Sequence, residues 1–209
     1  KIASIIMAGG KISKFNLKNK GQNMFAVKEA VFPFNKFPNV DVLLGPEMKS
    51  TGEVMGLDED FGLAFAKSQI AAGNSLPIKG LAFISLKDKH KNEGIDLAKK
   101  LIELNFSLCG TPGTANIIKK NGIRCKKINK VSEGFPNIVD TLNAKKIALV
   151  INTGGGKRTS RTQDSKYLRR ATLINKVPYC TNMSTAYACL KGIKSLKSKK
   201  IKVRAIQDI

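Results

Sequence analysis

The sequence predicts an α/β fold in which a doubly wound parallel sheet occupies residues 76–209. Short apolar runs, such as 81–86, alternate there with segments of helical spacing, such as 92–104. This alternation is typical of parallel sheets whose strands are joined through helices. A stretch rich in Gly, Asn, Ser and Pro, residues 72–77, precedes the region. We therefore place a domain boundary there, with a first unit at 1–75.

The first unit is predicted from less regular patterns. Residues 2–7 are expected to form a short helix, and residues 25–34 a strand that ends at Pro33. Residues 43–56 contain too many Gly and Pro residues for one regular element. Helical spacing predicts a helix over 59–71 with one set of apolar side chains to bury: Phe61, Leu63, Ala64, Phe65 and Ile70.

The second unit, residues 76–209, is predicted as a regular series of elements. Strands are expected at 81–86, 106–109, 124–129, 146–152, 177–180 and 202–206. Helices are expected at 92–104, 114–121, 136–143, 164–175 and 184–193, with a polar loop at 153–163. The first of these helices is amphipathic and is expected to bury four side chains: Ile95, Leu97, Leu101 and Ile102.

The composition is that of a soluble globular protein, with 42% apolar residues and no apolar run near the ~20 residues that span a bilayer. The formal net charge is +22, and residues 77–209 hold 28 basic and 8 acidic groups, which gives +20. This surplus favours anionic partners such as nucleotides or nucleic acid. Because 31 of the 37 basic residues are Lys, base composition of the source genome explains the surplus equally well.

The cysteines and the single histidine form no metal-binding pattern. His90 lies in a charged stretch, and the cysteines lie far apart without CxxC spacing: Cys109, Cys125, Cys180 and Cys189. We therefore expect reduced thiols, a cytoplasmic location and no metal site. Residues 1–10 lack a signal-peptide layout and do not begin with Met, so the chain looks like a piece of a longer protein.

The turn Cys109-Gly110-Thr111-Pro112-Gly113-Thr114 joins a predicted strand to a predicted helix. Its two glycines permit a sharp turn and the close approach of a ligand. Its two threonines place hydroxyl groups beside the free N–H groups of the first helical turn, where a phosphate or carboxylate is favoured. An ordinary capped turn explains the same residues, since Thr is a common N-cap.

The position of this turn favours the anion site. Asn129-Lys130 and Asn152-Thr153 also follow predicted strands. In open α/β sheets, ligands bind beyond the carboxyl ends of the strands. We therefore expect these three segments to meet at one edge of the sheet.

Three motifs of the first unit closely resemble the large chain of carbamoyl-phosphate synthetases. They are Phe-Pro-Phe-Asn-Lys-Phe at 32–37, Leu-Leu-Gly-Pro-Glu-Met at 43–48 and Ser-Thr-Gly-Glu-Val-Met-Gly at 50–56. They resemble the end of the second ATP-grasp unit, which phosphorylates carbamate. Residues 77–209 resemble the methylglyoxal-synthase-like regulatory domain that closes the same chain. The whole sequence is thus identified as a C-terminal part of that chain.

The resemblance implies that the full-length protein makes carbamoyl phosphate from bicarbonate, glutamine and ATP, with Mg²⁺ or Mn²⁺, for pyrimidine and arginine synthesis. Glutamine is hydrolysed on a separate small chain in this family. The metal-binding carboxylates and nucleotide-gripping lysines lie upstream, so this piece is expected to hold no catalytic residue and no cofactor, and to be inactive alone. Glu47 and Glu53 are better explained as packing or loop-capping groups.

In the second unit the resemblance implies an effector pocket, which takes uridine monophosphate, inosine monophosphate or, in some eukaryotic relatives, an acylated amino acid. The phosphate-binding residue types favour a nucleotide here. The positions that match its phosphate end are Lys91, Thr111, Thr114, Lys130, Asn152 and Thr153, and those that match its nucleoside end are Asp164 and Ser165. Hydroxyl groups and helix N–H groups donate to phosphate oxygens, and lysines supply charge. The sequence departs from the usual bacterial pattern at Gly154-Gly155-Gly156, where hydroxyl-bearing residues are expected. Glu29 and Thr181 match positions that contact ornithine in some relatives.

Two other functions are weaker interpretations. An active methylglyoxal synthase needs a carboxylate base and a histidine near the phosphate, but Pro136-Asn137 and Arg161 occupy those regions and His90 lies elsewhere. A nucleic-acid-binding module would use the lysine-rich run 191–202, which lacks interleaved aromatic residues.

Overall fold

The computed structural model describes residues 1–15, 23–31, 52–154, 160–203 and 205, and of residues 160–163 only the backbone. Much of the three motifs at 32–37, 43–48 and 50–56 therefore lies outside the described residues. The first part of the chain contains helix α1 (Ile2–Met7), the 3₁₀ turn η1 (Ile12–Lys14), strands β1 (Phe25–Val31) and β2 (Gly52–Asp58), and helix α2 (Phe61–Ala71).

The rest of the chain alternates between strands and helices, as predicted. The strands are β3 (Gly80–Ser85), β4 (Phe106–Gly110), β5 (Lys126–Lys127), β6 (Ile147–Asn152) and β7 (Tyr179–Cys180). The helices are α3 (Lys91–Glu103), α4 (Pro112–Lys120), α5 (Ile138–Asn143), α6 (Ser160–Ile174) and α7 (Met183–Ser198). Two 3₁₀ turns lie between them, η3 (Asp88–His90) and η4 (Val131–Glu133).

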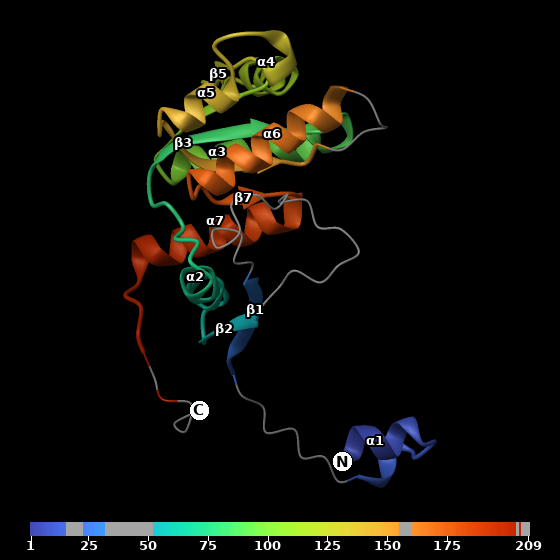
Figure 1. Ribbon diagram of the computed structural model, residues 1–209. Coiled ribbons are helices and arrows are strands. Elements are labelled where there is room, and N and C mark those ends of the chain that lie inside the picture. The colour runs from blue at the N-terminus through green and yellow to red at the C-terminus, as the bar shows by residue number, and fades with distance from the viewer. Residues whose placement is uncertain (16–22, 32–51, 155–159, 204, 206–209) are drawn as a thin grey trace.

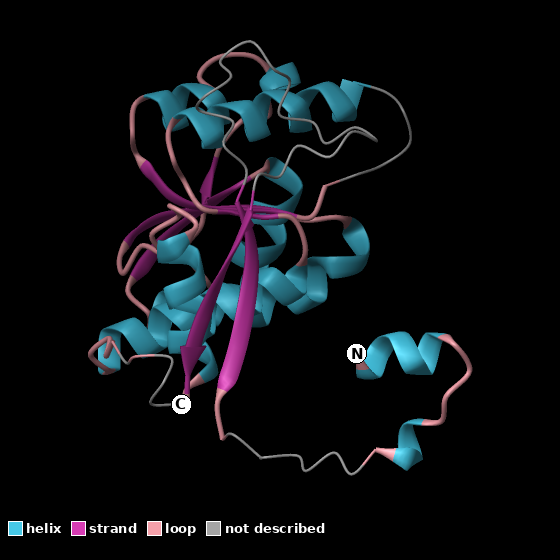
Figure 2. Ribbon diagram, turned by 60° about the horizontal axis from the view of Figure 1, so that its bottom comes forward, coloured by secondary structure: helices cyan, strands magenta, loops and turns pink. Residues whose placement is uncertain are grey.

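Strands β3 to β7 form one five-stranded sheet in the order β5-β4-β3-β6-β7, and every neighbouring pair is parallel. The chain runs outward from β3 to β5 and then returns to β6 on the other side of β3. Helices cover both faces (Figures 1 and 2). The predicted α/β class and its parallel sheet are confirmed. The strand order reverses between β3 and β6, which is where doubly wound sheets bind ligands.

The two faces of the sheet bury separate cores because successive side chains of a strand point to opposite sides. On one face, Ala82 and Ile84 of β3 pack with apolar residues of α3, α4 and α7. On the other face, Phe83 packs with residues of α5 and α6, among them Leu142 and Leu168. The middle of β3, Ala82 to Ile84, is therefore completely buried between the two helix layers.

A separate hairpin-like pair precedes the sheet. Strands β1 and β2 are antiparallel, and Phe25 lies opposite Asp58. Of residues 43–56, which were expected not to form one regular element, 43–51 lie outside the described residues and the last five belong to β2. Gly56 lies under helix α2, and a Cβ atom there would lie 2.0 Å from the carbonyl oxygen of Ala64. A glycine that looks like a turn signal therefore serves a close approach between strand and helix.

Helix α2 joins the first part of the chain to the sheet domain, because it packs on α7 as well as on β1 and β2. Phe65 and Ala66 of α2 share one hydrophobic core with the buried Leu76 of the predicted linker and with α7. A Cβ atom on Gly62 would lie 2.4 Å from the carbonyl oxygen of Lys191, so the two helices nearly touch there. The domain boundary at 72–77 stays a prediction, but the core is continuous across it.

Asp60 fastens this junction at the start of α2. One of its carboxylate oxygens accepts hydrogen bonds from Leu63 N at 2.9 Å and from Ser195 Oγ at 2.6 Å. The other accepts from Lys199 Nζ at 2.6 Å. The hydrogen bond from Lys199, followed by that from Ser195, holds the pKa of Asp60 well below its usual value. The N-cap of α2 is thereby tied to the end of α7.

Several predicted boundaries are wrong. Helix α6 begins four residues before the predicted start, because residues 160–163 contain no Gly or Pro to stop a helix. Helix α7 continues to Ser198, because its lysine-rich end still packs Leu196 against the core. The predicted strand at 202–206 is not observed in its described residues, 202, 203 and 205. The strands predicted at 124–129 and 177–180 are reduced to two residues each.

Two side chains expected to be buried are exposed. Ile70 is 45% exposed in the last turn of α2, and Ile102 is 41% exposed near the end of α3. Helix α3 thus buries a narrower stripe than its apolar content predicts, with Leu97, Ala98 and Leu101 inside. Among the described residues, no helix is both long and apolar enough to cross a membrane.

Candidate functional site

A cavity of about 400 Å³ opens at the carboxyl ends of the parallel strands. It lies where the strand order reverses, between the ends of β3 and β6 and beside the β4–α4 turn. Its lining includes seven of the eight residues that the family resemblance singles out: Lys91, Thr111, Thr114, Lys130, Asn152, Asp164 and Ser165. The expectation that these segments meet at one edge of the sheet is confirmed, while their binding of an effector stays a prediction.

The β4–α4 turn presents hydroxyl groups and helix N–H groups together. Pro112 is the first residue of α4, two residues earlier than predicted, and Thr111 is its N-cap. The hydroxyl of Thr111 donates to Thr114 Oγ1 at 3.2 Å instead of capping the helix. Within the described part of the chain, no acceptor is bonded to the backbone N–H groups of Gly113 and Thr114. These two donors are therefore available to an anion.

Thr114 also has a structural role. Its hydroxyl oxygen accepts a hydrogen bond from Leu86 N at 3.1 Å, and the residue is buried. This bond ties the segment after β3 to the start of α4. Thr114 thus orients the cavity wall, and Thr111 is the more exposed of the two residues, at 7% against 2%.

Two lysines line the same end of the cavity from different elements. Lys91 begins α3, and its ammonium group lies near the turn, since a Cβ atom on Gly113 would be 3.5 Å from Nζ. It forms an ion pair with Asp88 at 2.5 Å. Lys130 follows β5 and forms an ion pair with Glu133 at 2.9 Å. The phosphate end that the resemblance implies is therefore cationic, but each lysine already has a carboxylate partner.

The end of β6 is held by a small hydrogen-bond network. Asn152 is buried, donates through Nδ2 to the Tyr179 hydroxyl at 2.9 Å and accepts from Gly154 N at 3.0 Å. Burial raises the pKa of Tyr179 and outweighs the effect of the bond from Asn152. Thr153, in contrast, is not among the described residues that line the cavity. Its hydroxyl accepts from Lys87 N at 3.1 Å, so it braces the loop after β3.

Asp164 and Ser165 line the cavity from α6. Both carboxylate oxygens of Asp164 accept hydrogen bonds from Ser132, one from the backbone N at 3.0 Å and one from Oγ at 2.7 Å. Asp164 thus fastens η4 to α6 across the cavity. A ligand hydroxyl would have to share these oxygens or replace Ser132.

Glu29 and Thr181 do not line this cavity. Glu29 accepts a hydrogen bond from Gln69 Nε2 of α2 at 2.9 Å, and Thr181 is exposed between β7 and α7. A contact of either residue with ornithine stays a prediction.

The sequence interpretation missed the apolar part of the cavity, which consists of Phe83, Leu86, Val131, Ile138 and Leu168. These residues sit in apolar strand and helix patterns, so each could be predicted only as part of the core. Asp88 was also missed. Its place three residues before Lys91 is the one available signal, since residues at this spacing meet on a helical turn.

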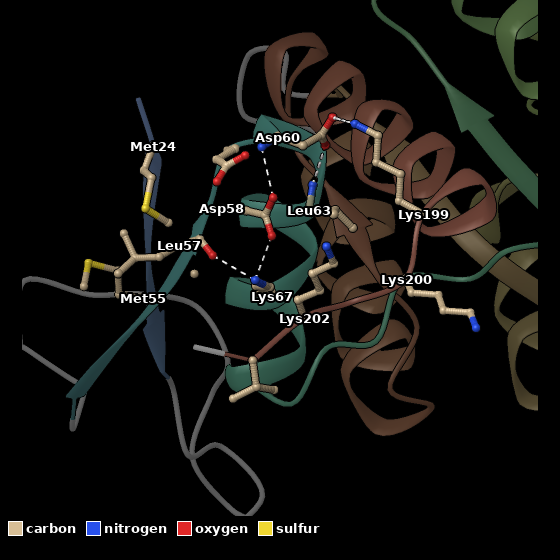
Figure 3. Close-up of a pocket in the computed structure, with 13 residues that line it drawn as sticks. Met24, Met55, Leu57, Asp58, Asp60, Leu63, Lys67, Lys199, Lys200 and Lys202 are labelled. Carbon is tan, nitrogen blue, oxygen red and sulfur yellow. Dashed lines mark hydrogen bonds and ion pairs between the residues drawn. The ribbon is translucent and has the colours of Figure 1, made fainter. Parts of the chain in front are cut away.

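A second cavity of about 730 Å³ lies between β2, the start of α2 and residues 199–203 (Figure 3). Charged side chains of this cavity form hydrogen bonds and ion pairs with other residues of its own lining. Lys67 donates to the Leu57 carbonyl at 2.9 Å and to Asp58 at 2.7 Å, and Lys199 is bonded to Asp60. None of the residues that match the effector or ornithine positions lines this larger cavity, so the cavity at the strand ends is the candidate site.

The histidine, cysteine and acidic side chains are the residues that could provide a metal site or, for the cysteines, a reactive thiol. Among the described residues, no group of three or more His, Cys, Asp or Glu side chains could hold a metal ion. All four cysteines are free and buried, and the sulfur atoms of Cys180 and Cys189 lie 3.3 Å apart in the core. His90 pairs with Glu93 at 3.6 Å and does not line the cavity, so the cavity lacks the histidine that a methylglyoxal synthase needs.

The lysine-rich run at 191–202 is also partly engaged within the fold. Lys191 lies over the ring of Phe61, Lys197 donates to the Leu104 carbonyl at 2.6 Å, and Lys199 pairs with Asp60. These contacts explain part of the run by packing, which weakens the interpretation of a nucleic-acid-binding patch.

Comparisons with known proteins agree with the resemblance. The family model of the MGS-like domain matches residues 93–181. The carbamoyl phosphate synthase large chain of Mesorhizobium japonicum is 47% identical over 216 residues, which cover 100% of this chain and 18% of that protein. The C-terminal section of that large chain from Aquifex aeolicus is 48% identical, with 91% and 36% covered. The large chain from Archaeoglobus fulgidus is 46% identical, with 100% and 19% covered.

A crystal structure of methylglyoxal synthase from Elizabethkingia anophelis aligns with a TM-score of 0.44 and 16% identity, and covers 55% of this chain and 79% of that one. The chain spans between 18% and 36% of the length of the curated relatives named above. The matches nevertheless extend over nearly all of its own residues. The chain belongs to the family of carbamoyl phosphate synthase large chains and carries the MGS-like domain of their C-terminal part.

Proposed function

We propose that this chain senses a nucleotide for a carbamoyl-phosphate-synthesising enzyme, and that its cavity binds uridine or inosine monophosphate as an allosteric effector. The observation that carries the proposal is the convergence of seven expected residues on one cavity at the point where the strand order reverses. These residues come from the β4–α4 turn, α3, the loop after β5, β6 and α6. Such an arrangement at a topological switch point is typical of nucleotide sites.

The two ends of the cavity suit the two ends of a nucleotide. Lys91, Lys130 and the free N–H groups of Gly113 and Thr114 supply charge and donors for a phosphate. The apolar side chains, Phe83 among them, provide a surface for a base. A cavity of about 400 Å³ falls within the range of small-molecule sites, ~300–1,000 Å³.

The remaining parts of the proposal concern the full-length enzyme. It would use ATP with Mg²⁺ or Mn²⁺ at sites upstream of this chain, take ammonia from a glutaminase small subunit, respond to ornithine near Glu29 and Thr181, and work in the cytoplasm. The chain alone would then produce no carbamoyl phosphate from ATP, bicarbonate and ammonia. Turnover above background by the purified 209-residue chain would contradict this part.

Removal of residues 77–209 from the full-length enzyme tests the sensor role. Basal synthesis should continue, while the change in rate on adding nucleotide should disappear. Allosteric coupling is usually ~1–3 kcal/mol, so the response of the intact enzyme should be several-fold to a hundredfold. Because α2 would lose its packing on α7, circular dichroism must first show that the truncated enzyme is folded. A folded truncation that still responds to nucleotide would place the sensor elsewhere.

A further inference from the structure

Glu133 faces the cavity lysine Lys130 with both carboxylate oxygens engaged. One oxygen is 2.9 Å from Lys130 Nζ, and the other accepts from Lys130 N at 2.9 Å. Burial raises the pKa of Glu133, but the hydrogen bonds from Lys130 outweigh it and the pKa lies below its usual value. Glu133 is therefore an ionised partner of the lysine that the proposed effector phosphate would need.

Lys91 has a similar partner in Asp88, but the two carboxylates differ in exposure. The side chain of Asp88 is 95% exposed, whereas that of Glu133 is 34% exposed. Solvent and salt screen the more exposed pair more strongly. Glu133 is thus the stronger of the two competitors for a cavity ammonium group.

We propose that Glu133 is a built-in counter-ion that competes with the ligand for Lys130 and thereby selects dianionic phosphate over weaker anions. The inference rests on the proposed nucleotide site. To bind Lys130, a phosphate group must replace the Glu133 carboxylate as the partner of the ammonium group, and it must also approach the negative charge of that carboxylate. A dianion gains enough binding free energy from Lys130, Lys91 and the helix N–H groups to do so. With a monocarboxylate, Lys130 exchanges one carboxylate partner for another, so little binding free energy is gained.

Glu133→Gln isolates the charge. The amide oxygen of Gln still accepts from Lys130 N, so the backbone of η4 keeps its cap, while the ion pair and the repulsion are lost. Exposed ion pairs of this kind are worth about 0.2–1 kcal/mol, so inorganic phosphate and uridine monophosphate should bind about 1.4- to fivefold more tightly. Acetate should gain by at least the same factor. Glu103→Gln, an exposed change on α3 away from the cavity, should leave all three affinities unchanged.

The full test is a double-mutant cycle on the 209-residue chain, with binding measured by calorimetry and folding by circular dichroism. Glu133→Gln should tighten binding more when residue 130 is Lys than in the Lys130→Ala background, where only the repulsion between Glu133 and the anion is lost. Equal or weaker binding by Glu133→Gln, while Lys130→Ala still weakens it, would overturn the counter-ion role and leave the nucleotide site intact. Failure of the unaltered chain to bind phosphate or nucleotide at all would overturn both.

Discussion

Replacing Gly62 by valine should lower the melting temperature of the chain by roughly 6–12 °C, which corresponds to about 3 kcal/mol for a domain of this size. A Cβ atom at this position would lie 2.3 Å from Ser195 Oγ and 2.4 Å from the Lys191 carbonyl oxygen. The second of these contacts is with backbone, which cannot rotate away. Helix α2 would have to move off α7 and disturb the core that Phe65 and Ala66 share with it.

Gly52→Val is the matched control for this prediction. It makes the same substitution in β2, where a Cβ atom would meet nothing within 4 Å. Valine also suits a strand better than glycine does. The melting temperature should therefore stay the same or rise slightly. Equal melting temperatures for the two variants would show that α2 and α7 are not packed as closely as described.

Replacing Lys130 by alanine should weaken nucleotide binding by roughly 10- to 150-fold, since a charge-assisted hydrogen bond contributes about 1.5–3 kcal/mol. Thr111→Ala should also weaken binding, because its hydroxyl lies beside the free N–H groups of α4. Lys130 is half exposed, so its loss should leave the fold intact. Calorimetric titration gives the affinity, and a thermal melt checks folding.

Lys99→Ala is the control for charge alone. Lys99 lies on the exposed side of α3 and does not line the cavity. Because the chain carries a net charge of +22, the loss of any one lysine reduces general attraction to anions slightly. If Lys99→Ala weakened binding as much as Lys130→Ala, the nucleotide would be held by overall charge and not by the cavity.

The sheet could be predicted from sequence because its strands are short apolar runs between turn signals. Residues 147–152 and 80–85 were recognised within one residue, since both are buried on two faces. Strand β2 could not be predicted, because Gly56 is required by the approach of α2, a contact remote in the chain. The end of α7 was predicted five residues too early, because residues 194–198 are mostly Lys and Ser, although Leu196 among them still packs against the core.

The polar residues of the candidate site could be predicted from the family resemblance together with the rule that ligands bind at strand ends. Its apolar residues could not, because Phe83 and Leu168 lie in the same apolar sequence patterns as core residues. The pairing of Lys130 with Glu133 also escaped prediction, since a spacing of three residues outside a regular helix does not fix side-chain geometry. Thr153 was assigned to the phosphate, but its hydroxyl is bonded to the loop after β3.

The most direct test of the effector site is a calorimetric titration of the 209-residue chain with uridine monophosphate, inosine monophosphate, inorganic phosphate and uridine. We expect saturable binding of at least one monophosphate with one site per chain, weaker binding of phosphate and none of uridine. Binding should also weaken as salt rises, because lysines supply part of the attraction. Absence of binding by both monophosphates, or equal binding of uridine and its monophosphate, would contradict a cavity built around phosphate.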